Sequence, residues 1–329
     1  MACSKVFVVE SKSFEVREED GKGKGQLSFL CNFLSRSIQD LVSEVGIMSA
    51  MRHPNLVMLF GCCVEEDNLI LIYEYMENGA LSRALFGVGD EFPIRLDWKT
   101  RKKICLGIAK GVAYLHDESG ISIIHRDIKA DNILLDRDLN AKVSDFGLSK
   151  LITDDHDLSF PTFCGTPGYM APEILRGDPL TKKVDVFSFG VLIIEIICGQ
   201  RSSTYSTLAG FTSLVHRVFS VHSQGGDLLE LVDSKLDLRS HQEEALALFR
   251  VGILCCQNSP TLRPSMLTVV SMLEGQTAVE VSMDVELVGN NNTRGFTDQN
   301  STSGTDVSGA ISSIRRHIAS GKQPFLGTT

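Results

Sequence analysis

Three short polar motifs in the middle of the chain constrain its fold more than any other feature. They are HRDIKADN at residues 125–132, DFG at 145–147 and APE at 171–173. Each motif alone is common by chance. Their joint order and spacing is far more specific than any one of them, because three independent matches must coincide in one chain.

Together the motifs resemble the catalytic loop, magnesium loop and end of the activation segment of a eukaryotic protein kinase. The resemblance covers roughly residues 33–275 and is finer to plant leucine-rich-repeat receptor-like serine/threonine kinases, in their cytoplasmic kinase domain. The segments that carry it are HPNLV at 53–57, GCC at 61–63, YEYMENG at 73–79 and MLEG at 272–275. It implies an α+β, bilobal protein-kinase fold. The N-lobe would be incomplete, a short antiparallel sheet plus one helix, and the C-lobe mainly helical.

Composition and local pattern divide the chain into four predicted parts. They are an atypical N-terminal segment at 1–26, a partial N-lobe at 27–76, a C-lobe at 77–275 and a disordered tail at 276–329, rich in Asn, Ser, Thr and Gly. The N-lobe is expected to hold a helix ending near Met51 and a hairpin of strands 56–60 and 69–73.

In the C-lobe, apolar spacing predicts a helix between Trp98 and His116 and amphipathic helices near 246–256 and 266–273. Residues 184–198 are apolar nearly all round, so they predict a helix enclosed by the protein itself.

Charge and cysteine content exclude several classes of protein. The chain has 32 basic and 41 acidic residues, a net charge of -9, which argues against a nucleic-acid binder. Nine cysteines without C-x-x-C spacing predict neither a disulfide framework nor a zinc site. The longest apolar run, 186–194, is too short for a bilayer of about 30 Å, and no signal peptide is expected. We expect a cytoplasmic chain without a transmembrane span, which partners could hold at the plasma membrane; a longer form could carry a membrane anchor.

The resemblance implies chemical roles for the two central loops. Asp127 would orient the attacking hydroxyl and take its proton, and Lys129, a serine/threonine-type lysine, would steady the transferring phosphate. Asn132 and Asp145 would bind Mg²⁺, which prefers hard oxygen ligands. The implied function is transfer of the γ-phosphoryl group of ATP to serine or threonine hydroxyls of a protein substrate in signalling, with ATP and Mg²⁺ as cofactors. Receptor or co-receptor kinases are the other expected partners.

The resemblance also implies a nucleotide site. Glu44 lies where the family places the glutamate that binds the nucleotide lysine. Tyr73 would be the gatekeeper, backbone groups of Glu74 and Met76 would meet adenine, and Leu134 would form the adenine floor.

The activation segment and its support are likewise implied. Ser159, Thr162 and Thr166 are candidate phosphorylation sites, and Thr166 also lies in the loop that would receive the substrate. Arg126 would pair with an added phosphate.

Four further residues have structural roles by resemblance. His125 would pack under the catalytic loop, and Asp185 would meet free backbone donors near the start of the buried helix. Glu173 and Arg263 would form a buried ion pair of the large lobe.

The pattern departs from the family in the small lobe. No glycine-rich loop and no Val-Ala-Val-Lys strand precede Glu44. We favour a truncated or mis-spliced receptor-like kinase of impaired activity, in which residues 1 to about 30 replace the missing strands. One alternative is a catalytically inactive pseudokinase acting as a binding scaffold. Another is that Lys22 or Lys24 reaches the phosphates from an unconventional position.

Overall fold

The computed structural model describes residues 45–46, 48–49, 51–65, 68–87, 94–152, 164–202, 206–207, 210–211 and 213–281. All of them belong to one of the two units into which the chain divides, residues 1–288. The atypical N-terminal segment at 1–26, most of the first helix and the tail from residue 282 lie outside the described residues. Residues 45, 46, 48 and 49 of that helix are helical.

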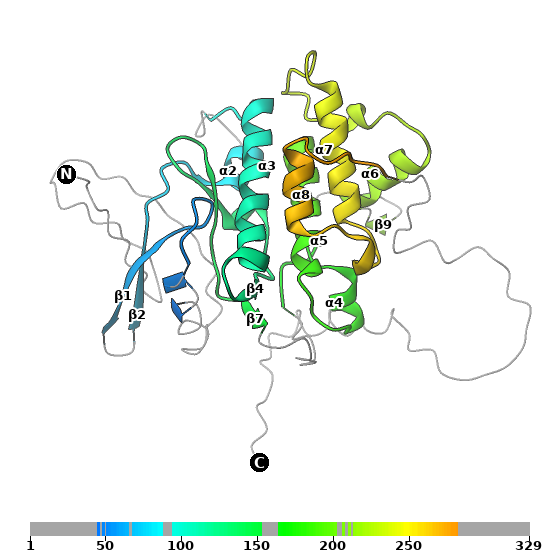
Figure 1. Cartoon of the computed structure of the whole chain (residues 1–329). Coiled ribbons are helices and arrows are strands. Elements are labelled where there is room, and N and C mark those ends of the chain that lie inside the picture. The colour runs from blue at the N-terminus through cyan, green and yellow to red at the C-terminus, as the bar shows by residue number, and fades with distance from the viewer. Residues whose placement is uncertain are drawn as a thin grey trace, which may run out of the picture. The chain divides into compact units, whose positions relative to one another are not determined.

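The N-terminal described part is an antiparallel hairpin of β1 (Leu59–Glu65) and β2 (Asn68–Tyr73), seen side by side in Figure 1. The predicted hairpin is therefore confirmed, but β1 begins three residues late. The reason is that the residues before it pair elsewhere: the Val57 N–H donates to the Val143 carbonyl, and the Val143 N–H to the Asn55 carbonyl, both at 2.9 Å. Residues 56–60 are all apolar, so their sequence suits pairing with either β2 or β6. In the structure, residues 55 and 57 pair with Val143 of β6.

Short strands position the catalytic motifs. A three-stranded sheet has the order β3 (Gly79–Ala80), β5 (Ile133–Leu135) and β6 (Ala141–Val143). Residue 132 directly precedes β5 and Asp145 follows β6 by two residues, so the pairing of β5 with β6 brings the two motif loops to one edge. Two further pairs are β4 (Ser122–Ile124) with β7 (Lys150–Ile152), and β8 (Ser206–Thr207) with β9 (Gly210–Phe211).

The rest of the described chain is mainly helical. The predicted helices at 98–116, 184–198, 246–256 and 266–273 are confirmed with small shifts of their ends. The helices are α2 (Leu81–Phe86), α3 (Trp98–Ala113) with the π-helical turn η1 (Tyr114–Glu118), η2 (Ala130–Asn132), α4 (Pro172–Arg176), α5 (Lys183–Cys198), α6 (Leu214–Ser223), η4 (Leu228–Leu231), α7 (Gln242–Cys255), η5 (Pro260–Leu262) and α8 (Met266–Leu273).

Helix α5 is the centre of the helical part, as its apolar sequence predicts. Every residue from Val184 to Cys198 is buried except the half-buried Phe187. Gly190 lets α7 approach closely, because a Cβ atom there would lie 2.7 Å from both Cys255 Cβ and Cys256 Sγ. No helix among the described residues is long and apolar enough to cross a membrane.

Candidate active site

The loop between β4 and β5 holds Asp127 in a network of charged hydrogen bonds. The carboxylate is nearly buried, with 7% of the residue exposed. Oδ1 accepts the Thr166 hydroxyl at 2.6 Å, and Oδ2 accepts Lys129 Nζ at 2.7 Å. Lys129 Nζ also donates to Thr166 Oγ1 at 2.9 Å. The structure therefore brings together three predicted site residues, two from the loop and one from the segment that precedes α4.

Asn132 completes this network from η2. Its Nδ2 donates to the Asp127 main-chain oxygen and to Asp127 Oδ2, both at 3.0 Å. The amide hydrogens are thus committed to Asp127, which fixes the amide orientation. Oδ1 has no hydrogen bond within the described part of the chain, so the oxygen that could bind a cation remains available.

Asp145 is held beside the catalytic loop by its two neighbours. Ser144 donates both its N–H and its hydroxyl to the Asn132 carbonyl, at 2.9 Å each. Phe146 is buried and packs edge-on against the His125 ring, with 5.0 Å between ring centroids. Contacts on both sides of Asp145 thus place it next to the residues that hold Asp127, with a left-handed backbone at φ 65°.

His125 supports the catalytic loop through hydrogen bonds of both ring nitrogens. It is fully buried, its Nε2 contacts the Ser144 carbonyl at 3.0 Å, and its Nδ1 accepts the Asp127 N–H at 3.2 Å. Because a carbonyl can only accept, Nε2 carries a proton, and both ring nitrogens have a hydrogen-bond partner. These contacts agree with the predicted packing role.

Asp185 of α5 was expected to meet the free backbone donors at the start of its own helix, but it binds the catalytic loop. Its carboxylate accepts the His125 N–H at 2.7 Å, the Arg126 N–H at 2.8 Å and His116 Nε2 at 2.9 Å. Burial alone would raise its pKa, yet the His116 hydrogen bond and charge hold the pKa below the usual value. Sequence reasoning missed His116, because nothing distinguishes it at the end of a helix.

Backbone groups after β2 offer a pair of unused hydrogen-bonding sites. The Glu74 N–H donates to the Met58 carbonyl at 3.0 Å, and the Met76 carbonyl accepts the Gly79 N–H at 3.1 Å. The Glu74 carbonyl and the Met76 N–H have no partner among the described residues, which leaves one acceptor and one donor two residues apart. Leu134 in β5 is half-buried between two buried neighbours, so it faces away from the core. Tyr73 is the last residue of β2.

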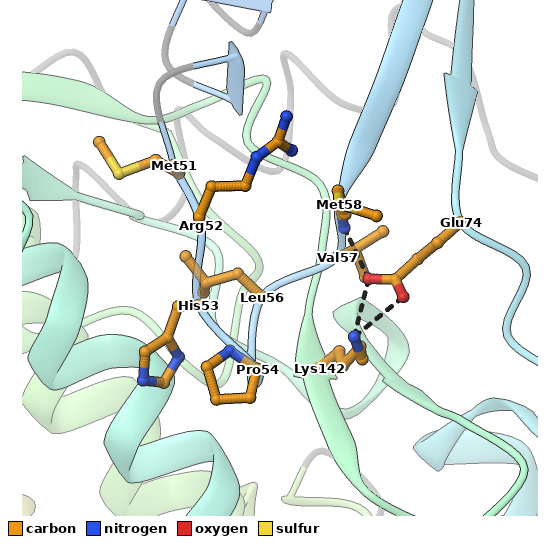
Figure 2. A pocket seen from close by; sticks show the side chains of 9 residues that line it. All are labelled: Met51, Arg52, His53, Pro54, Leu56, Val57, Met58, Glu74 and Lys142. Atoms are coloured by element: carbon orange, nitrogen blue, oxygen red, sulfur yellow. Dashed lines mark hydrogen bonds and ion pairs between the residues drawn. The ribbon is translucent and has the colours of Figure 1, made fainter.

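The Glu74 side chain has a role that the sequence did not reveal. It accepts the Met58 N–H at 2.7 Å, and both carboxylate oxygens lie 2.9 Å from Lys142 Nζ of β6. Figure 2 shows the carboxylate between these two groups, at a cavity of about 280 Å³ that residues 51–54 also line. Burial lowers the pKa of His53 there. No sequence signal connects residues 74 and 142.

Of the remaining predicted residues, three have contacts in the structure and five lie outside its described part. Glu173 and Arg263 meet in a buried pair, with contacts of 2.5 and 2.7 Å. The Arg126 guanidinium donates from Nε to the Leu148 carbonyl. The other predicted residues lie outside the described part of the chain: Lys22, Lys24, Glu44, Ser159 and Thr162.

Comparison with known proteins identifies the family of this chain. The protein kinase domain model matches residues 31–273. The chain belongs to the protein kinase family. This kinase is 51% and 50% identical, over 74% of its length, to two probable LRR receptor-like serine/threonine-protein kinases of Arabidopsis thaliana, and it spans 24% and 23% of their lengths. It is 41% identical to the cold-responsive protein kinase 1 of the same plant, over 74% of this chain and 63% of that protein. The predicted resemblance to plant receptor-like kinases is confirmed, and the kinase spans about a quarter of the length of the first two relatives.

Proposed function

We propose that this kinase transfers the γ-phosphoryl group of ATP to serine or threonine hydroxyls of a protein substrate. The observation that carries the proposal is the Thr166 hydroxyl, which donates to Asp127 and accepts from Lys129 at hydrogen-bonding distance. A substrate hydroxyl in that setting would have a carboxylate for its proton and a cation for the transferring phosphate. The names of the relatives, serine/threonine-protein kinases, agree with this reaction.

We propose the following roles in the reaction. Asp127 orients the hydroxyl and receives its proton, while Lys129 neutralises charge on the moving phosphoryl group. Asp145 and Asn132 Oδ1, which accepts no hydrogen bond from the described residues, would hold Mg²⁺, and these hard oxygen donors fit that ion. When bound, Mg²⁺ supplies charge neutralisation at the nucleotide phosphates.

The nucleotide base is proposed to lie against the segment after β2. The carbonyl of Glu74 and the N–H of Met76, which have no partner in the described part of the chain, match an acceptor and donor edge such as that of adenine, next to Leu134. Tyr73 as gatekeeper and Glu44 as partner of a nucleotide lysine belong to the same proposal. Its support is the pair of unused backbone groups.

We propose that phosphorylation of Ser159 or Thr162 gives Arg126 a partner, and that Thr166, bonded to Asp127, positions the substrate loop. Receptor or co-receptor kinases are the proposed partners besides the substrate, and the cytoplasm the proposed location. The boundaries at residues 26, 76 and 275 stay predictions.

Phosphate transfer to serine peptides and a thermal shift with Mg-ATP test the proposal. Asp127→Asn should lower transfer at least about a hundredfold but keep the thermal shift, because the nucleotide site is intact. Asp145→Ala should lose both. Asp138→Asn, an exposed carboxylate in the turn after β5, is the matched control and should resemble the wild type. A wild-type chain without transfer, or Asp127→Asn with undiminished transfer, would refute the proposal.

A further inference from the structure

An exposed arginine lies beside the proposed acceptor site. Arg201 follows the end of α5, and its guanidinium lies over the Phe86 ring of α2, 4.7 Å from the centroid. Arg201 NH1 is 3.5 Å from Asp131 Oδ2, in the η2 turn. These contacts place the cation where α2, the end of α5 and the catalytic loop meet.

The position of Asp131 relates this cation to the acceptor hydroxyl. Asp131 is four residues from Asp127, so their Cα atoms are at most about 14 Å apart. An extended substrate covers that distance with about four residues. Arg201 is therefore within reach of side chains close to the acceptor in a bound peptide.

A second chain of hydrogen bonds runs from Thr166 to the residue that follows Arg201. The Tyr169 N–H donates to the Thr166 carbonyl at 3.1 Å, and its hydroxyl donates to Glu195 Oε2 at 2.5 Å. Glu195 Oε1 accepts the N–H of Ser202, the residue after Arg201, at 2.6 Å. Glu195 is 1% exposed and bonded through both oxygens, so it is not open to a peptide.

Both charged partners of this contact, Arg201 and Asp131, reach solvent. Their side chains are 42% and 47% exposed, so the ion pair is weak and its partners can exchange. Only one of the five N–H donors of the guanidinium contacts Asp131, which leaves a fork that fits a second carboxylate. Asp131, in turn, is covered by Arg201 and offers little attraction to a basic side chain.

We propose that Arg201 is a specificity-determining residue that gives the kinase a preference for acidic side chains within about four residues of the acceptor serine or threonine. The inference rests on the proposed function and adds a substrate class to it. Without Arg201 the Asp131 carboxylate is uncovered, so the preference should turn toward basic peptides.

Two peptides with the same acceptor serine, flanked by aspartates or by lysines, test this with the full chain. Initial phosphate-transfer rates with Mg-ATP and binding by fluorescence anisotropy without nucleotide are measured for each peptide. The wild type should favour the aspartate peptide by about threefold to fivefold, the size expected for one exposed ion pair. Arg201→Ala should remove or reverse this preference, and Asp131→Asn should increase it.

Arg176→Ala is the matched control, because Arg176 of α4 is 45% exposed and pairs with Asp178 at 2.9 Å. It should keep the wild-type preference. Arg201→Ala with an unchanged preference, or a wild type that favours lysine, overturns the inference. Phosphate transfer without any charge preference overturns it while the proposed function stands. A charge preference in binding without transfer overturns the proposed function alone, and neither binding nor transfer overturns both.

Discussion

Loss of the buried Arg263 guanidinium should destabilise the helical part strongly. Arg263 is 1% exposed and bonds Glu173 through two nitrogens, at 2.5 and 2.7 Å. It also donates to the carbonyls of Gln257 and Lys183, at 2.8 and 2.9 Å. Arg263→Met leaves the Glu173 carboxylate buried without its partner, and it removes the arginine donor from three carbonyls, those of Gln257, Lys183 and Asn258. Breaking one side of such a pair costs about 3–5 kcal/mol, which corresponds to a loss of roughly 10 °C in Tm for a domain of this size.

A double-mutant cycle separates the pair from ordinary packing. The double variant Glu173→Leu/Arg263→Met removes both charges, so it should be more stable than Arg263→Met alone. Urea unfolding followed by circular dichroism gives the free energies of unfolding for all four proteins. Two results would refute the reasoning. One is a free energy of unfolding that falls by less than about 1 kcal/mol in Arg263→Met, and the other is a double variant that is less stable than Arg263→Met.

Two further predictions concern a partly buried carboxylate, Glu74, and a buried one, Glu195. Lys142→Met removes the partner of Glu74 in a pair whose side chains are less than one-fifth exposed. Urea unfolding should therefore show a free energy of unfolding lower by about 1–2 kcal/mol. The control Lys110→Met, from a more exposed pair with Glu274, should lower the free energy of unfolding by less than about 0.5 kcal/mol. Burial raises the pKa of Glu195 from 4.5 to about 7, so the folded state binds its proton more tightly than the unfolded state, and the free energy of unfolding should fall by at most about 3 kcal/mol as the pH rises from 4.5 to 7. Glu195→Gln should lack this part of the pH dependence; an unchanged pH profile in that variant would contradict the assignment.

The sequence was sufficient where the determinants are local. Asp127, Lys129 and Asn132 lie within six residues, so their hydrogen bonds follow once the loop is recognised. The sequence of α5 is apolar nearly all round the helix, which predicts its burial without any knowledge of its partners. The amphipathic spacing of α8 is likewise local, and its predicted bounds are those observed.

The resemblance implied the long-range pair of Glu173 and Arg263, but the partners of Glu74 and Asp185 could not be predicted, because no motif in the sequence pairs them. Glu74 and Lys142 are 68 residues apart, and His116 and Asp185 are 69 apart. Each side chain has an ordinary place in the chain: Glu74 directly follows β2, Lys142 lies within β6, His116 in the turn after α3 and Asp185 in the first turn of α5. The choice of partner is decided by how those elements pack, which one sequence does not state. The late start of β1 has the same cause, since residues 55 and 57, just before it, pair with β6.

The Asp185 carboxylate explains how this packing reaches the chemistry. Arg126, directly before Asp127, has a left-handed backbone at φ 69°, a conformation that costs a non-glycine residue about 1–3 kcal/mol. Two backbone N–H groups at this turn donate to the one carboxylate, and hydrogen bonds to a charged acceptor contribute about 1.5–3 kcal/mol each. They therefore offset the strain only while α5 keeps Asp185 in place. Since α5 is the most enclosed helix described, the position of Asp127 depends on the core of the helical part and not on the loop sequence alone.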